Sequence, residues 1–263
     1  MNNDWAYSTG INNLKSFPPN TSDYYFTKVN LPHNADAYDG YRRLLHGNKH
    51  GDIWYRKILK LTQPNKSRRN FLYFEGVGSY AKIYLNGSLV GEHAGGRTTF
   101  TIDVTGKLKT NGTANELLVF ASHPANIKDL PWVCGGCSDE RGFSEGSQPM
   151  GIFRPVHLIV TNDVRIEPFG IHAWADVQND KAILSINTTL KNYSLQNRKV
   201  EIINRLVDAA GKNIKEVTIQ QILKAKDSIT ILQNNITVHN PNLWSVVKIL
   251  TCIKLFLLLK KII

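Results

Sequence analysis

The residues of this chain that could carry out chemistry gather in one stretch, from Leu130 to Met150. Within it, Cys134 and Cys137 are separated by two glycines, the spacing of redox dithiols and of half a zinc site. A redox pair should open a helix beside a strand, and structural zinc needs two further ligands at a matching spacing. Neither context is present, so structural thiols are favoured over a disulfide, and a disulfide over metal or redox chemistry. The sequence predicts no cofactor and no metal site.

Residues 142–146 of the same stretch read Gly-x-Ser-x-Gly, the pattern of the serine hydrolase nucleophile elbow. That elbow needs a strand that enters a sharp turn into a helix, whereas here a Cys- and Gly-rich loop precedes the serine and Ser-Gln-Pro follows. A serine hydrolase is therefore disfavoured. The histidines contain no H-E-x-x-H zinc motif. Four of them lie in strand or turn contexts and are expected to be ordinary hydrogen-bonded side chains: His33, His93, His157 and His172.

The elements that must hold this stretch are strands, organised around residues 70–106. Ala81, Ile83 and Leu85 recur at every second position, the period of a half-buried strand. Asn86-Gly87 then supplies the positive φ values of a two-residue hairpin turn. A third strand from Thr99 to Val104 is expected to complete a meander of antiparallel strands. The segment predicts a β-sandwich and by itself indicates no chemistry.

Further strand patterns occur on both sides of this segment. They are at 53–61, 116–121 and 151–160 and, beyond a linker at 161–163, at 169–177, 181–190, 199–207, 214–220 and 228–238. The second group is spaced as strands are in an immunoglobulin-like sandwich. Residues 122–150 show no periodicity, and a structureless stretch of that length is usually functional or mobile. We expect it to project from one end of the first sandwich.

Four motifs resemble a known family. Residues 74–105 read F-E-G-V-x-S-x-A-x-I-Y-x-N-G-x-x-V-G-x-H-x-G-G-x-T-x-F-x-x-D-V-T, and L-P-H-N at 31–34, G-I-F-R-P-V at 151–156 and P-N-L-W-S at 241–245 follow the same order. They are similar to the N-terminal sugar-binding domain of glycoside hydrolase family 2, which includes β-galactosidases, β-glucuronidases and β-mannosidases. The resemblance implies an all-β chain with a jelly-roll sandwich at 1–162 and an immunoglobulin-like sandwich at 163–245.

The resemblance also implies an activity, the hydrolysis of terminal β-linked sugars, and galactosides are the substrates that we expect first among these. Such chemistry requires two carboxylates that flank the scissile bond. In the family both come from a (β/α)₈ barrel that follows these two domains, so no catalytic residue is assigned here. The chain is expected to be the N-terminal, non-catalytic part of such an enzyme and to be inactive alone. Alternatives are a free-standing carbohydrate-binding module and a structural or oligomerisation domain.

The resemblance also implies a supporting role in sugar binding for one residue of the stretch from Leu130 to Met150. In some β-galactosidases of the family, an aspartate six residues before the glycine of G-I-F-R projects into the sugar pocket. Glu145 holds that position here and is one methylene longer. Its alternative role is a solvated loop carboxylate. Trp132 and Phe143 are candidates to stack on a sugar ring or to bury the stretch against a barrel, whereas Asn34 is expected to be a turn residue.

The composition changes after Ser245. Residues 246–263 contain only apolar residues, Thr, Cys and four lysines, so this short segment contributes +4 to the chain's net charge of +11. The family pattern is expected to be lost there, through a change of frame or a truncation. Lys248 and Lys254 interrupt the segment too closely for a membrane span, so an unpatterned tail is favoured over an interfacial helix. Because this charge is not spread over a sandwich face, no nucleic-acid partner is expected. No apolar leader opens the chain, and its compartment and oligomeric state stay open.

Overall fold

The computed structural model describes residues 1–9, 18–23, 25–35, 51–62, 68–123, 150–241 and 254–261. The chain divides into two compact domains, Met1–Val160 and Thr161–Ile263. Within the described ranges, no helix is long and apolar enough to cross a membrane. The fold is all-β, as predicted; its helical element is a single 3₁₀ turn, η1 (Thr21–Asp23), in the part of the chain that the structure describes.

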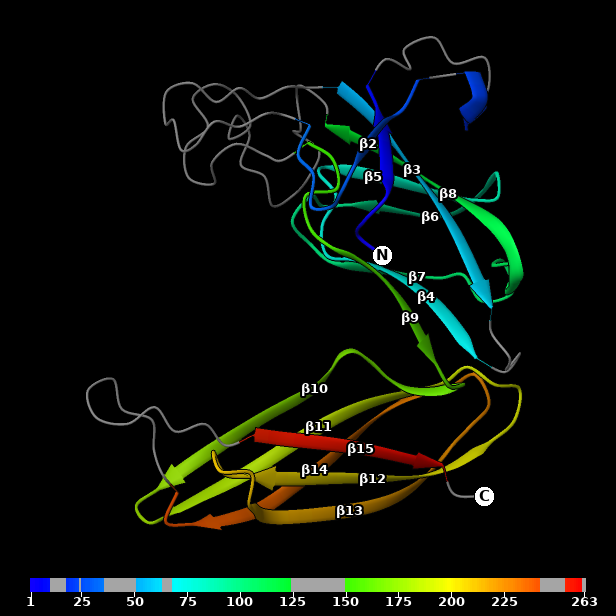
Figure 1. The fold of residues 1–263 in the computed structure, drawn as a ribbon. Coiled ribbons are helices and arrows are strands. Elements are labelled where there is room, and N and C mark those ends of the chain that lie inside the picture. Colours follow the sequence, from blue (N-terminus) through cyan, green and yellow to red (C-terminus); the bar gives the residue numbers. More distant parts are fainter. Residues whose placement is uncertain are drawn as a thin grey trace, which may run out of the picture. The chain divides into compact units, whose positions relative to one another are not determined.

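The first domain is a sandwich of two antiparallel sheets (Figure 1). The larger sheet has the spatial order β2 (Thr27–Val29), β1 (Trp5–Ser8), β3 (Gly51–Thr62), β8 (Asn111–His123), β5 (Tyr80–Leu85), β6 (Ser88–Ala94). The smaller sheet has the order β7 (Phe100–Asp103), β4 (Arg69–Phe74), β9 (Val156–Thr161). Strands distant in sequence are thus neighbours, as β3 and β8 are.

The predicted hairpin is confirmed between β5 and β6. Asn86 and Gly87 have φ values of 51° and 81°, and Leu85 pairs with Ser88 across the turn. The expected meander is wrong at its third strand, because β7 pairs with β4 in the smaller sheet. The chain crosses between sheets after Gly96, where a Cβ atom would lie 3.2 Å from the Cα of Gly78. A side chain at this crossing would force one of the two backbones to shift, so the close approach favours a glycine.

The core of the first domain fills the space between its two sheets. Every second residue of the central strands points inward, and the buried side chains form one cluster that includes Trp5, Tyr55, Phe74, Ile83 and Val119. The opposite face of the larger sheet carries a second, smaller cluster of Trp54, Tyr84 and Leu118, with Phe26 and Phe120 packed against it. The central strands are consequently buried on both faces, which gives a rigid base for the loops at the sandwich end.

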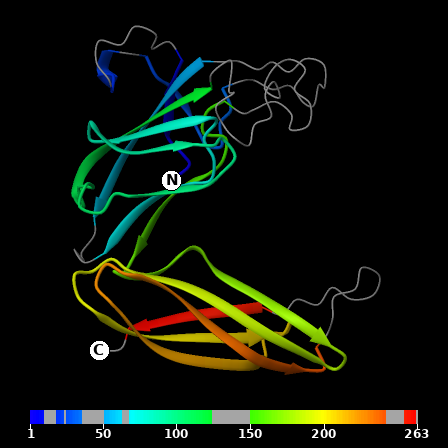
Figure 2. The same ribbon diagram turned by 180° about the vertical axis from the view of Figure 1, so that it is seen from behind.

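The second domain consists of two three-stranded sheets (Figure 2). One has the order β10 (Val164–Gln178), β11 (Lys181–Asn192), β14 (Ser228–His239); the other has the order β13 (Asn213–Leu223), β12 (Arg198–Val207), β15 (Lys254–Lys261). All pairs are antiparallel, and residues 208–211 connect β12 to β13 with a turn, as predicted.

Strand β15 differs from the sequence-based expectation of an unpatterned tail at 246–263. It runs along β12 in both ribbon views, from Lys254 opposite Val207 to Lys261 opposite Val200. Leu255, Leu257 and Leu259 pack against the buried clusters of the domain. The run of leucines therefore forms an edge strand that closes the core, because its alternate side chains meet an apolar surface.

A polar layer divides the core of the second domain. In each of three strands one polar residue interrupts the inward-facing apolar positions: Thr188 in β11, Asn204 in β12 and Gln233 in β14. Apolar residues on one side of this layer form one buried cluster, and those on the other side form a second. The side-chain amide of Asn204 donates a hydrogen bond to the side-chain carbonyl of Gln233. This bond joins the two sheets through the middle of the core.

Candidate functional site

Two of the four sequence motifs lie side by side at the end of the first domain. The backbone N–H of His33 donates to the carbonyl of Ile152 over 2.8 Å, and that of Ala35 donates to the carbonyl of Met150 over 2.8 Å. The side-chain oxygen of Asn34 accepts a hydrogen bond from the Met150 N–H at 2.9 Å. Asn34 was expected to be a turn residue, whereas its side chain binds the backbone of a segment distant in sequence. These bonds fix the backbone at the C-terminal end of residues 124–149.

Tyr55 of β3 contacts the junction that residues 33–35 and 150–152 form. Its hydroxyl lies 2.7 Å from Nδ1 of His33, and the ring of Tyr7 lies 4.4 Å from the His33 ring. Burial lowers the pKa of His33 and raises the pKa of Tyr55, so both groups stay neutral near pH 7. The two neutral groups share one hydrogen bond, in which the His33 tautomer decides whether the phenol or Nδ1 is the donor. The pair is a neutral structural hydrogen bond and carries no charge for catalysis.

Gly151 is the residue at which the junction tolerates no side chain. Its φ is +110°, a conformation that residues with a Cβ rarely adopt. A Cβ atom there would lie 2.1 Å from the hydroxyl oxygen of Tyr55. The glycine of G-I-F-R-P-V is therefore required by packing against Tyr55.

The N-terminal end of residues 124–149 is held by a buried Ser–His pair. Oγ of Ser79 lies 2.9 Å from Nδ1 of His123, and both side chains are at most 3% exposed. The N–H of Ser79 donates to the carbonyl of Ser122, while Gly78 forms a bridge to Gly151. A serine closed off from solvent cannot reach a substrate, so this pair is structural. The segment Gly78-Ser79 consequently ties together both ends of residues 124–149.

The predicted site residues themselves lie outside the described residues. These are Trp132, Phe143 and Glu145, together with Cys134 and Cys137. The structure instead shows the backbone from which they depart, at His123 and Met150. Within the described ranges, no group of three or more His, Cys, Asp or Glu side chains could hold a metal ion. The described part of the site is thus a hydrogen-bonded framework.

Three of the four histidines are hydrogen-bonded, as predicted. His33 contacts Tyr55, His93 lies 2.8 Å from the hydroxyl of Thr98, and His157 lies 2.8 Å from a carboxylate oxygen of Glu75. His172 instead packs against the ring of Trp174, 5.1 Å between centroids, and makes no hydrogen bond within the described chain.

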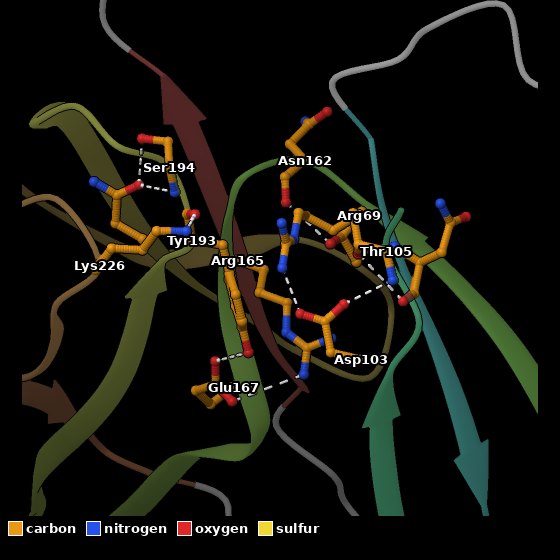
Figure 3. Close-up of polar contacts among 12 residues, drawn as sticks. Arg69, Asp103, Thr105, Asn162, Arg165, Glu167, Tyr193, Ser194 and Lys226 are labelled. Atoms are coloured by element: carbon orange, nitrogen blue, oxygen red, sulfur yellow. Dashed lines mark hydrogen bonds and ion pairs between the residues drawn. The ribbon is translucent and has the colours of Figure 1, made fainter. Parts of the chain in front are cut away.

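Carboxylates of both domains serve as structural partners, as Figure 3 shows for two of them. In the first domain Asp103 pairs with Arg69 and accepts a hydrogen bond from the N–H of Thr105 at 2.9 Å. Burial opposes the ionisation of Asp103, but the bonds from Thr105 and Arg69 outweigh it and hold its pKa below the ordinary value. In the second domain Glu167 accepts a hydrogen bond from the hydroxyl of Tyr193 at 2.9 Å. Both carboxylates stabilise strands.

The comparisons with known proteins assign this framework to a family. The family described as "Glycosyl hydrolase 2 galactose-binding domain-like" matches residues 36–131, and "Glycosyl hydrolases family 2" matches residues 164–248. The chain belongs to glycoside hydrolase family 2. Its two sandwiches correspond to the N-terminal, non-catalytic part of a family 2 sequence, as the motifs predicted.

Relatives within family 2 carry two different names. A β-galactosidase of Thermoanaerobacter pseudethanolicus is 31% identical over 94% of this chain, and a β-glucuronidase of Formosa agariphila is 26% identical over 93%. The crystal structure of a β-glucuronidase from Bacteroides uniformis has the same fold, with a TM-score of 0.76 over 93% of this chain at 24% identity. The chain spans 32%, 26% and 28% of these three proteins, so about a third or less of their length. The family context is carbohydrate processing.

Sequence reasoning missed several residues of the family 2 framework. No role was predicted for Tyr55, Ser79 or His123, because each lies within or at the end of an ordinary strand pattern, although Ser79 belongs to the motif at 74–105. A signal was nevertheless present for Ser79, which follows Gly76 and Gly78 directly after an apolar strand. Such a glycine-rich strand end indicates a close approach of another chain segment.

Proposed function

We propose that this chain supplies the two non-catalytic sandwich domains of a glycosidase that hydrolyses terminal β-linked sugars, galactosides first. The observation that carries the proposal is the pairing of residues 33–35 with 150–152, which places the backbone six residues after Glu145 in a fixed position. The β-galactosidase relative, with 31% identity over 94% of the chain, supports the choice of galactosides. Neither reacting carboxylate is assigned to this chain.

Glu145 is the residue that would connect this framework to chemistry. A carboxylate held at the rim of a sugar pocket accepts hydrogen bonds from sugar hydroxyls. A hydrogen bond to a charged group contributes about 1.5–3 kcal/mol, which corresponds to roughly a ten- to hundred-fold effect on rate. Trp132 and Phe143 would then flank the same sugar through their ring faces.

The test is a chimera in which this chain replaces the matched part of the Thermoanaerobacter pseudethanolicus β-galactosidase. We expect hydrolysis of an aryl β-galactoside by the chimera and none by the chain alone. Glu145→Gln should lower kcat/KM by roughly ten- to a hundred-fold, as estimated from the loss of one charged hydrogen bond. Glu140→Gln, in the same stretch, is the matched control and should leave kcat/KM unchanged. An equal effect of the two substitutions would remove Glu145 from the pocket.

A second candidate function is carbohydrate binding by the chain on its own. The outer face of the smaller sheet in the first domain favours it, because that face combines aromatic rings with an ordered carboxylate. This function needs no barrel and none of the residues at 124–149.

A further inference from the structure

The outer face of the sheet β7-β4-β9 carries a group of polar and aromatic side chains separate from the framework at 124–149. Leu72 and Phe74 of β4 point into the core, so Tyr73 between them points outward. Thr101 of β7 lies directly opposite Tyr73 in the register and therefore shares its face. Both side chains are partly exposed.

His157 and Glu75 extend this group across the sheet. Nε2 of His157 lies 2.8 Å from Oε1 of Glu75, and the rings of His157 and Tyr73 are 5.9 Å apart with a tilt of 36°. The Glu75 side chain is 35% exposed and that of His157 is 44% exposed. The N–H of Glu75 donates to the carbonyl of Pro155, which fixes the backbone beneath the carboxylate. The hydrogen-bonded pair of Glu75 and His157 is thus accessible and at the same time ordered.

Hydrogen-bonding capacity remains on each of these side chains. Within the described residues, neither the hydroxyl of Tyr73, nor Oε2 of Glu75, nor Nδ1 of His157 has a partner. An ordinary solvated sheet face carries long, flexible charged side chains. This face instead presents two rings and a short carboxylate that is held by an imidazole. Rings beside ordered acceptors suit a ligand that has both an apolar C–H face and hydroxyl groups.

We propose that this face binds a neutral pyranoside; the inference rests on the second candidate function, carbohydrate binding by the chain on its own, and assigns its site and ligand class. The apolar C–H face of the sugar packs on the Tyr73 ring. One sugar hydroxyl donates to Oε2 of Glu75. Because the Nε2–H of His157 is directed at Glu75, its Nδ1 accepts from a neighbouring hydroxyl when the imidazole is neutral. A uronic acid binds less well, since its carboxylate meets the negative charge of Glu75.

The experiment uses the full chain, labelled with ¹⁵N, and follows its amide resonances at pH 7.5 during titration with methyl β-D-galactopyranoside. We expect saturable shifts at Tyr73, Glu75 and His157, with a Kd on the order of millimolar, as for a ligand that gains about 4 kcal/mol. Methyl β-D-glucuronide, the anionic counterpart, should bind several-fold more weakly. Shifts that do not saturate, or equal affinity for the two sugars, would overturn the proposal.

Two variants and a control locate the site. Tyr73→Ala should abolish the saturable shifts, and Glu75→Gln, which keeps the side-chain volume, should raise Kd by at least about threefold through loss of a charged acceptor. Tyr25→Ala is the matched control, since Tyr25 is 84% exposed and lies before β2. It should bind as the unchanged chain does. Unaltered affinity in a folded Glu75→Gln variant would refute this site even if Tyr73→Ala failed to fold. Activity of the chimera is a separate readout, so the two proposals can fail independently.

Discussion

Strand β15 permits a sharp test of the second domain, because neighbouring leucines on it face in opposite directions. Leu257 packs against a buried cluster, whereas Leu258 is 42% exposed. Leu257→Asp and Leu258→Asp remove the same side chain and add the same charge. A difference between the two variants therefore reports which face of the strand meets the core.

The expected loss for Leu257→Asp is roughly 3 kcal/mol of unfolding free energy. A half-buried leucine contributes about 1–1.5 kcal/mol, and an unpaired carboxylate at that position would cost several more. However, β15 is an edge strand and can detach from β12. The loss is then limited to what Leu255, Leu257 and Leu259 contribute together, about 3–4 kcal/mol. Leu258→Asp, on the exposed face, should cost about 1 kcal/mol or less.

Thermal unfolding and limited proteolysis measure the two consequences. A loss of 3 kcal/mol should lower the Tm of a domain of this size by roughly 10–20 °C, while the transition of the first domain stays unchanged. A lysine-specific protease should cut faster at Lys254 and Lys260 in Leu257→Asp than in Leu258→Asp, because the detached strand is open to cleavage. Equal Tm shifts, or a larger shift for Leu258→Asp, would refute the register of β15 and favour the unpatterned tail.

Three further predictions concern single positions. Gly151→Ala should lower the unfolding free energy, measured by chemical denaturation, by about 2–4 kcal/mol, because it adds backbone strain and a steric clash. Gly106 also has a positive φ but lies in open space, so Gly106→Ala should lower the unfolding free energy by only about 1 kcal/mol. Asn204→Leu should cost about 1–3 kcal/mol because it leaves Gln233 without its donor, and adding Gln233→Leu should recover most of that loss; additive losses would contradict the coupling. Because the pKa of His33 is lowered in the folded state, the unfolded chain binds more protons, so the contribution of His33 to stability is full above about pH 6.5 and falls as the pH drops below that value. His33→Gln should therefore reduce the decrease in the urea midpoint of unfolding between pH 7 and pH 5. An unchanged decrease would contradict this role of His33.

Local patterns were sufficient to predict most strands but not the sheet to which each belongs. The alternation at 81–85 and the Asn86-Gly87 turn predicted the hairpin, because both depend on neighbouring residues alone. The partner of β7 depends on where the chain crosses after Gly96, which is decided by contact with Gly78, far away in sequence. A pattern of alternating residues contains no information about that contact.

The tail shows the same limit more clearly. Residues 254–261 have no apolar–polar alternation, so no strand was predicted there. The segment becomes a strand through β12, whose Ile202 and Leu206 offer an apolar inner row opposite Leu259 and Leu255. The partner, not the segment's own pattern, decides which leucines face inward.

The candidate site was predictable in its framework because the motifs that carry the family resemblance are packing motifs. Gly151 leaves room for the hydroxyl of Tyr55, Asn34 binds the N–H of Met150, and His33 completes the junction. None of these groups is a carboxylate, so none supplies either of the two carboxylates that sugar hydrolysis requires. The motifs therefore establish how the chain is held at His123 and Met150, and they would do so equally in an enzyme and in a binding module. Activity has to come from residues that the framework displays, which is why Glu145→Gln and Glu75→Gln, rather than any substitution in the motifs, separate the two functions.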